Sequence, residues 1–599
     1  MKSEPILVHH TRLAPDDVYL SRLIEFFGLT CRTVDTSTLD TELDRAADHD
    51  LCILASAAVI DGWCRSFANP VVALDKLRQK ASFVFVYGFV PELSTVYIAT
   101  SLTEGGIADV RRFKRTDLRY QVSSSRPEIT REFSGLSFGC VRNATDFGFV
   151  CSADSRSMVS LVSIEGTPFW IVAEKDRCKT FLLACNAIAD TQERIKGNID
   201  VTSYFSRLLP AAMFLRFAFT SRCWHGKHQF GNFIIDDPPL KRSYGYLNFR
   251  ELVSKMDTYD FASTIAFIPW NYRRSDSEVT QLFRERQDRL SLCVHGCDHT
   301  EAEFSSTDLY VLNSKVRLAS ARMNCLHREN NLSFAKTMVF PQGGFSIEAL
   351  TALKSNNYVA ALNSSGSPAN AWADGSLTVA DFLYPAITRY TGFPLFVRRY
   401  PGGLEQFALD LFCGKPLLVV EHHEYFKDGG AHLAEFISRL NSFEGLQWRG
   451  LNEIVMKSYL EREISNEVFA CRLQTNHSVI ENQAERERTC IVNKFEPGDV
   501  PVQNVLVNGR PTRFKMIDHV LEFETRIPAF SSGVVKIAYR NLLPHVTPGQ
   551  GFAARSRVWA RRMLCEFRDN VLCRNDLLFA GGQALCRGIS GRAAAGPTH

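Results

Sequence analysis

Strand-like and helix-like segments alternate between about Tyr204 and Leu460, and this alternation limits the possible folds more than any other feature. Short apolar runs of the kind that form buried parallel strands recur there, and segments with helical apolar spacing separate them. The strand-like runs are Phe233–Ile235, Ser263–Ile268, Leu290–Val294, Thr337–Phe340, Val359–Leu362, Leu395–Val397 and Leu417–Val420. The helical segments include Leu247–Lys255, Glu278–Arg289, Leu309–His327, Ile347–Ser355 and Ala431–Asn441. About seven such units in about 250 residues predict an α/β barrel, whose polar groups gather at the carboxyl ends of the strands.

Two carboxylates and two histidines follow strands of this predicted barrel. Asp236 and Asp237 end the first apolar run, and His295 and His299 follow the third. Adjacent side chains diverge on an extended backbone, so the two carboxylates can do different work. One carboxylate and both imidazoles are typical ligands of a mononuclear metal hydrolase, while the other carboxylate is free to take a proton from water. The sequence therefore predicts a metal site here.

The same residues allow other interpretations. An Asp-Asp-Pro-Pro segment is also typical of a solvated turn. Cys293, His295, Cys297 and His299 alternate along the chain, as ligands of a Cys/His structural zinc site can do. Ligands from one run of seven residues seldom surround a tetrahedral ion, because structural sites usually combine two separated pairs. The pattern favours the Asp-His-His site.

Four motifs in this region resemble those of polysaccharide deacetylases of the NodB-homology type. They are Ile235-Asp-Asp237, His295-x-x-x-His299, Phe340-Pro-Gln-Gly-Gly344 and Val420-Glu-His422, between about Trp224 and Val455. The resemblance implies a deformed (β/α)7 barrel and metal-dependent removal of acetyl groups from sugars. It also implies that Asp236 is the general base, that Asp237, His295 and His299 hold the metal, and that His422 is the general acid.

The chemistry of amide hydrolysis near neutral pH is consistent with these roles for the metal, the base and the acid. A divalent metal, for which we expect zinc, acidifies water and polarises the acetyl carbonyl. Asp236 would take the proton, and an imidazole would deliver one to the departing amine. His422 and His423 both follow the last strand, and we prefer His422 as the acid. A surface histidine pair without a role is the alternative.

The chain departs from the family pattern in several places. Pro238 stands where the first motif usually has Gly, and Val339 stands where the third usually opens with an arginine that orients the base. Arg398 or Arg399 would restore that charge. The fourth motif has only a loose counterpart in Trp372 and Asp374. A non-catalytic carbohydrate-binding protein with a degenerate barrel, or an amidase acting on a non-sugar N-acyl compound, therefore stays open.

Substrate contacts are expected from residues that follow the strands. Trp270 would lie near the mouth of the site, where its ring would stack on a sugar, although a packed core tryptophan fits the sequence equally well. The residues we expect to bind substrate are Pro341, Gly343, Trp270 and Arg398.

Other domains are expected on both sides of the barrel, which we place at residues 201–460. Residues 1–200 predict an α/β domain of flavodoxin-like or amidotransferase-like type with a binding role, closed by a helix at Thr180–Thr191. Residues 461–545 predict a small antiparallel β domain with a turn at Val507–Arg510. Residues 546–599 predict a basic, amphipathic helical tail. Its apolar stripe consists of Trp559, Met563, Phe567 and Val571.

Composition narrows the remaining possibilities. The 599 residues are 45% hydrophobic with a formal net charge of +4, which gives no reason to expect nucleic acid as a partner. No transmembrane segment and no secretion signal is seen, and seventeen cysteines occur without a framework spacing, so we expect a cytoplasmic protein. A weak contact of the tail with a membrane surface stays open beside docking on the protein itself.

Overall fold

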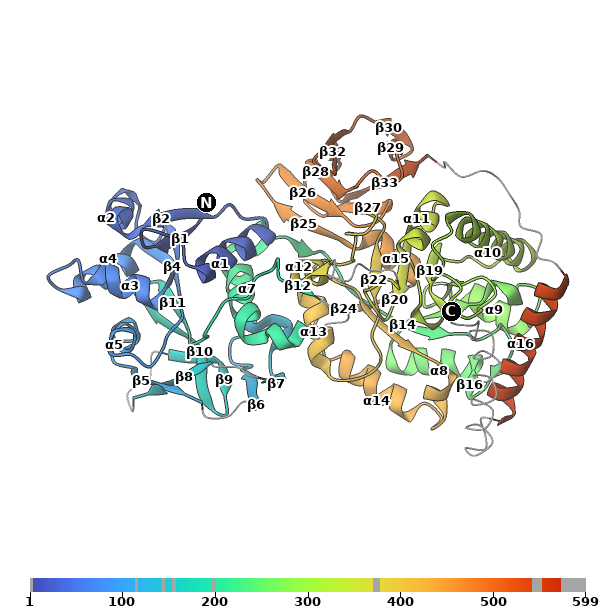
Figure 1. Ribbon diagram of the computed structural model, residues 1–599, viewed down its shortest axis with the longest axis horizontal. Coiled ribbons are helices and arrows are strands. Elements are labelled where there is room, and N and C mark those ends of the chain that lie inside the picture. The colour runs from blue at the N-terminus through green and yellow to red at the C-terminus, as the bar shows by residue number, and fades with distance from the viewer. Residues whose placement is uncertain are drawn as a thin grey trace, which may run out of the picture.

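The structure is a computed structural model, and it describes residues 4–113, 117–142, 146–152, 158–195, 201–369, 377–540 and 552–572. An α/β layer, a parallel barrel and a pair of β sheets follow one another along the chain (Figure 1). Trp372 and Asp374 lie outside the described residues. Among the described helices, none combines the length and the apolar character needed to cross a membrane.

The N-terminal layer is one mixed sheet of nine strands. In spatial order these are β2 (Arg32–Asp35), β1 (Pro5–His9), β3 (Leu51–Ser56), β4 (Ala81–Tyr87), β11 (Cys178–Leu183), β10 (Thr167–Lys175), β9 (Met158–Ile164), β6 (Asp117–Val122) and β7 (Ser137–Arg142). The first five are mutually parallel and the rest are antiparallel. The helices of this layer include α1 (Pro15–Phe26), α2 (Thr36–Arg45), α3 (Ala57–Cys64), α4 (Pro70–Lys80) and α5 (Leu93–Leu102). The expected α/β architecture is therefore present.

The helix expected at Thr180–Thr191 is wrong. Cys178–Leu183 forms β11 instead, which pairs parallel with β4 on one side and antiparallel with β10 on the other. Phe181, Leu182 and Leu183 are fully buried. A short apolar run buried on both faces cannot be told from a buried helix by periodicity, and its neighbours in the sheet decide the outcome.

Seven parallel strands form the barrel in the middle of the chain. In spatial order they are β22 (Leu395–Val397), β20 (Ala360–Asn363), β19 (Thr337–Val339), β18 (Leu290–His295), β17 (Ser263–Phe267), β14 (Gln229–Asp236) and β23 (Leu417–Glu421). Just after β22, Arg399 forms a parallel bridge with Val419 of β23, so the two ends of the sheet meet. The short strand β24 (Leu446–Trp448) pairs with the start of β14. The expected deformed (β/α)7 barrel is the observed fold.

Each barrel strand is followed by a helix, as the alternation predicted. These helices are α8 (Phe249–Tyr259), α9 (Ser277–Glu285), α10 (Leu309–Asn330), α11 (Ile347–Ser355), α12 (Val379–Leu383), α13 (Leu404–Phe412) and α14 (Ala431–Leu440). Helix α7 (Phe205–Phe219) joins the barrel to the N-terminal sheet, where Phe214 stacks on Phe85 with 4.7 Å between ring centroids. The hydrophobic core is thus continuous between the two regions.

The C-terminal β region consists of two sheets around a core of their own. One contains β13 (His225–Gly226), β25 (Tyr459–Glu463), β26 (Val468–Leu473), β28 (Arg488–Phe495), β32 (Val520–Ile527) and β31 (Lys515–Ile517). The other contains β27 (His477–Asn482), β33 (Ser531–Tyr539), β29 (Val502–Val507) and β30 (Arg510–Thr512). The expected turn joins β29 to β30, with positive φ at Asn508 and Gly509. The expected antiparallel arrangement has one exception, since β26 and β28 run parallel.

Helix α16 (Phe552–Asn570) lies along one side of the barrel, where it contacts the short strand β15 (Ser243–Tyr244) (Figure 1). It packs through its polar face: Glu566 is 8% and Asp569 1% exposed, whereas Trp559 is 58% and Phe567 53% exposed. The tail therefore docks on its own protein, but with its apolar stripe turned toward solvent. Ion pairs hold it there.

Candidate metal centre

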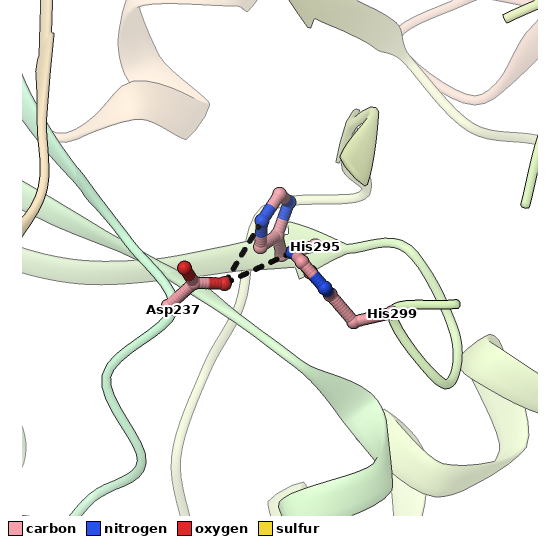
Figure 2. A group of neighbouring side chains, drawn as sticks. All are labelled: Asp237, His295 and His299. Carbon is pink, nitrogen blue, oxygen red and sulfur yellow. Dashed lines mark ion pairs between the residues drawn. The ribbon is translucent and has the colours of Figure 1, made fainter. Parts of the chain in front are cut away.

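Three predicted metal ligands converge at the carboxyl ends of β14 and β18 (Figure 2). Oδ1 of Asp237 lies 3.3 Å from Nε2 of His295 and 3.1 Å from Nε2 of His299. This oxygen is buried and forms no hydrogen bond of acceptable geometry. One carboxylate oxygen and two imidazole nitrogens thus converge as an ion-paired group, without a hydrogen bond to that oxygen within the described residues.

The backbone fixes the orientation of the His295 ring. Its Nδ1 lies 3.1 Å from the carbonyl oxygen of Val339 on the neighbouring strand. A carbonyl can only accept, so Nδ1 carries a proton, and in its neutral form the ring keeps a lone pair on Nε2. Burial acts to lower the pKa of His295, but the charges of Asp236 and Asp237 outweigh it and raise the pKa in the absence of metal. This is the usual way in which a hydrogen bond outside a metal site prepares a histidine ligand.

A buried glutamate holds the loop that carries His299. The carboxylate of Glu303 accepts hydrogen bonds from the backbone N–H groups of Cys297, Asp298 and His299, at 3.0, 2.9 and 3.1 Å. Gly296 begins the loop with a φ of +61°, and a Cβ there would collide with the Pro341 ring and the Glu303 carboxylate. Sequence reasoning did not identify Glu303, because binding to backbone N–H groups leaves no spacing signature.

Asp236 has a different environment from its neighbour Asp237. Both of its oxygens accept from the guanidinium of Arg398, at 2.6 and 2.7 Å, and both side chains are buried. Burial alone would raise the pKa of Asp236, but the charges of Arg398 and His295 outweigh it and hold the pKa below its usual value. The expected division of the two carboxylates between different partners is what the structure has.

The arginine missing at Val339 is replaced from another strand. Val339 is fully buried and contributes its carbonyl to His295. Arg398 follows β22 and reaches Asp236, whereas Arg399 pairs with Asp410 at 2.5 Å. The prediction that one of these two arginines restores the charge is confirmed for Arg398. Its guanidinium is bound to the Asp236 carboxylate by two hydrogen bonds. The expected contact of Arg398 with substrate stays a prediction.

The two candidate acids lie in different surroundings. His422 is half-buried at the end of β23, and its charge is near enough to lower the pKa of Asp236, although burial and Arg398 affect that pKa more. His423 is 3% exposed, and its ring meets Tyr244 edge-on at 5.2 Å. Its Nε2 lies 3.7 Å from Asp569 of α16. This geometry favours His422 as the residue that faces the site.

The expected substrate contacts lie on loops that adjoin the ligands. The backbone N–H of Trp270 donates to the carbonyl of Cys297 at 3.1 Å, and its half-buried ring is covered by Arg274 at 5.4 Å. Pro341 is buried, and the carbonyl of Gly343 accepts from Asn363 at 2.9 Å. All of these loops follow barrel strands, so they surround the same end of the barrel.

The alternative Cys/His zinc site does not form. Cys293 belongs to a separate core cluster, and Cys297 lies with Asp298 and Glu303 rather than with the histidines. Burial, together with the charges of Asp298 and Glu303, raises the pKa of Cys297 well above its usual value. The thiol therefore stays protonated, whereas a zinc ligand must be a thiolate.

The Asp-His-His cluster fits a metal ion. Tetrahedral ligands about 2.0–2.1 Å from zinc lie about 3.3 Å from one another, close to the two separations found here. Burial lowers the pKa of His299, although Asp237 acts against this, and the neutral ring is the form that binds metal. The barrel and this cluster define an α/β protein with a candidate metal centre at the carboxyl ends of its strands.

Comparisons with known proteins find similarity in structure alone. No family model matches the sequence, and no curated protein matches it. The structure is similar to that of Agd3, described as a novel carbohydrate deacetylase, with a TM-score of 0.47 and 9% identity over 89% of this chain and 98% of that chain. It is also similar to a family 4 carbohydrate esterase from Streptomyces lividans in complex with acetate (TM-score 0.23, 10% identity, 37% of this chain and 92% of that chain).

A third similar structure is BA3943 from Bacillus anthracis, described as a CE4 family pseudoenzyme. Its TM-score is 0.25, with 9% identity over 39% of this chain and 67% of that chain. All three likenesses are distant, so the chemistry of the site is taken from its own side chains.

Proposed function

We propose that this protein is a metal-dependent hydrolase that removes an acetyl group from an N-acetylated carbohydrate. One observation carries the proposal. Asp237, His295 and His299 bring three ligand atoms together around a buried carboxylate oxygen that has no hydrogen bond within the described residues, while the adjacent Asp236 is bound by Arg398. A metal site with a separate, ionised carboxylate beside it provides the two groups that attack by water on an amide needs, a Lewis acid and a general base.

The roles of the residues follow from their positions. Asp237, His295 and His299 would hold the ion, for which zinc is the first choice, and the ion would acidify water and polarise the acetyl carbonyl. Asp236 accepts the proton of the attacking water, and Arg398 keeps its carboxylate oriented, so we assign Arg398 a positioning role. His422 donates a proton to the departing amine. Trp270, Pro341 and Gly343 shape the place of the sugar.

Acetate release and metal content test the proposal together. Asp236→Asn should keep the metal and lower acetate release from N-acetylated sugars by about 10²- to 10⁴-fold, because the general base is lost. His295→Ala should lose both metal and acetate release. His432→Ala is the matched control, since this histidine on α14 has a side chain 75% exposed.

The alternatives make different predictions in the same experiment. Tight metal without acetate release from any acetylated sugar would identify a carbohydrate-binding protein with an inactive barrel. Acetate released only from non-sugar N-acetyl compounds would identify an amidase of another class. A purified protein without metal, which gains none on titration with zinc, would overturn the site.

We also propose a cytoplasmic location. Fourteen cysteines whose side chains the structure describes are free, and most of them are buried. Free buried thiols are typical of proteins kept in a reducing compartment. Fractionation of cells that produce the protein would test this location, and recovery outside the cytoplasm would contradict it.

A weak contact with an anionic membrane surface is a second proposal, supported by the outer face of α16. Trp559, Leu564, Phe567 and Val571 are between 43% and 58% exposed there, and arginines flank them. Aromatic side chains beside arginines favour the interface of anionic lipids. Sedimentation with vesicles that contain anionic lipid should exceed sedimentation with neutral vesicles, and Trp559→Ser should remove the excess. Equal sedimentation with both vesicles would contradict the contact.

A further inference from the structure

A buried arginine of α16 faces the barrel with most of its guanidinium unpartnered. Arg562 is 2% exposed, and within the described residues neither its Nε nor its Nη2 has a hydrogen-bond partner. Leaving guanidinium donors buried without acceptors costs free energy. A group that the described part of the chain does not supply would satisfy them.

The anchors of α16 place Arg562 beside the candidate metal centre. Arg562, Glu566 and Asp569 stand at positions i, i+4 and i+7, so they share the helix face that meets the barrel. Glu566 pairs with Lys241 at 3.0 Å, on the loop that follows Asp237, and with Arg274 at 2.9 Å. This face therefore packs against the loops at the carboxyl ends of β14 and β17.

Two further hydrogen bonds hold the end of the helix on the segment that follows Asp237. Asp569 accepts from the hydroxyl of Tyr244, and the side chain of Asn570 accepts from the backbone N–H of Gly245 at 2.9 Å. Burial raises the pKa of Tyr244 most; the charge of Asp237 raises it further and that of Arg562 lowers it. Arg562 stands one turn before Glu566, so it lies on the side of the helix that faces these loops.

The acidic neighbours of Arg562 are occupied by other partners. Glu566 is taken by Lys241 and Arg274, and Asp569 is bound by Tyr244 and Arg568. An arginine with a purely structural task would be expected to use one of these carboxylates. Nε and Nη2, which have no partner among the described residues, share one edge of the guanidinium, and that edge is the one that binds an acceptor with two oxygens.

We propose that Arg562 binds an oxyanion of the substrate, a carboxylate or a phosphate, close to the acetyl group that is removed. The inference rests on the proposed function for that acetyl group and narrows its substrate to an acidic or phosphorylated N-acetyl sugar. A planar guanidinium with two free N–H directions matches such a group in bidentate fashion, and the uncharged hydroxyls of a neutral sugar do not.

Three sugars of graded charge test the inference on the full-length, zinc-loaded protein. They are N-acetylglucosamine, N-acetylglucosamine 6-phosphate and N-acetylmuramic acid, titrated by calorimetry. The wild type should bind one of the two anionic sugars at least tenfold more tightly than the neutral sugar. Which of the two it binds shows whether the site takes a phosphate or a carboxylate. Arg562→Gln should lower the affinity for that sugar by about 10- to 100-fold, which corresponds to the loss of a charge-assisted hydrogen-bonded pair. Its affinity for the neutral sugar should change less than twofold.

Two further variants make the comparison sharp. Arg557→Gln is the matched control, because Arg557 is exposed on the same helix, and its affinities should equal those of the wild type. Arg562→Lys keeps the charge but loses the planar fork, so its affinity for the anionic sugar should fall between those of wild type and Arg562→Gln. If Arg562→Gln fails to fold, a selective loss in Arg562→Lys supports the inference.

Several outcomes would overturn it. The first is a wild type that binds neither anionic sugar more tightly than the neutral one. The second is an equal loss of affinity for all three sugars in the Arg562 variants, which would place the guanidinium on the acetyl group or in the packing of α16. The third is no loss of affinity at all in these variants. Acetate release measured in parallel separates this inference from the proposed function. Binding preference without acetate release contradicts the hydrolase alone, and acetate release without preference contradicts the anion site alone.

Discussion

Two clusters of three potential metal ligands lie side by side in the described barrel, and they differ in one respect. Asp237, His295 and His299 form the first, and Cys297, Asp298 and Glu303 form the second. In the first, the ligand oxygen of Asp237 is buried without a hydrogen bond. In the second, every carboxylate has protein donors.

The second cluster is satisfied by its own surroundings. Glu303 accepts three backbone N–H groups, and Asp298 pairs with Arg322 at 2.7 Å. Its only sulfur ligand, Cys297, keeps its proton because burial raises the pKa of the thiol. The comparison teaches that residue type and proximity do not define a metal site. Unsatisfied, deprotonated ligand atoms define it.

The two clusters meet in one residue. The ring of His299 faces Asp237, while its backbone N–H donates to Glu303. The second cluster therefore acts as the support of the first: it fixes the loop from which one ligand projects. Variants in each cluster should affect metal binding to very different extents.

The largest effect is expected from removing a ligand of the first cluster. His299→Ala should bind zinc too weakly to survive dialysis, because two ligands cannot replace three. Metal that binds only the folded state adds about 2.7 kcal/mol of stability when its concentration is a hundred times Kd. A chelator should therefore lower the thermal midpoint of the wild type by several degrees and leave that of His299→Ala unchanged. An equal fall of the thermal midpoint in both proteins would show that the ion binds elsewhere.

An intermediate effect is expected from the support. Glu303→Gln keeps the size of the side chain but turns an amide NH₂ toward backbone donors that need acceptors. We expect a loss of about 10- to 100-fold in zinc affinity, the usual cost of disturbing a residue that orients a ligand. Unfolding free energy should fall by about 1–3 kcal/mol.

Competition with a colorimetric chelator measures the zinc affinity of this variant. Glu301→Gln is the matched control, because Glu301 is exposed in the same loop. Zinc affinity equal to that of the wild type in Glu303→Gln would show that the loop keeps its shape without the carboxylate, and the second cluster would lose its supporting role.

The barrel could be predicted from the sequence because its strands are buried on both faces. Such strands appear as short, continuous apolar runs, and Ile347–Ser355 even has the predicted bounds of α11. The helix predicted at Thr180–Thr191 is wrong although Phe181–Leu183 is also a short apolar run, because periodicity alone does not separate a buried strand from a buried helix. Pairing with β4 and β10, which the local sequence does not contain, made it a strand.

The candidate site was predictable where a side chain acts directly and obscure where it acts through another residue. Asp236, Asp237, His295 and His299 stand out because reactive groups follow apolar runs. Glu303 and Arg322 act on a backbone and on a neighbouring carboxylate, and such roles leave no spacing pattern. The sequence predicts helix α16 and allows its docking on the protein, but not that its charged face is the buried one, since that burial depends on partners such as Lys241 and Arg274 that are distant in sequence.

The smallest effect is expected from the thiol, and it tests the comparison most directly. Cys297→Ala should leave zinc stoichiometry and affinity unchanged within twofold, because a protonated, buried thiol is no ligand. The lost packing should cost about 1 kcal/mol of unfolding free energy, measured by urea denaturation. Cys293→Ala should behave in the same way, since Cys293 packs in another part of the core. A large loss of zinc affinity in Cys297→Ala alone would place the metal in the satisfied cluster, and a large loss in both variants would restore the alternating Cys/His site.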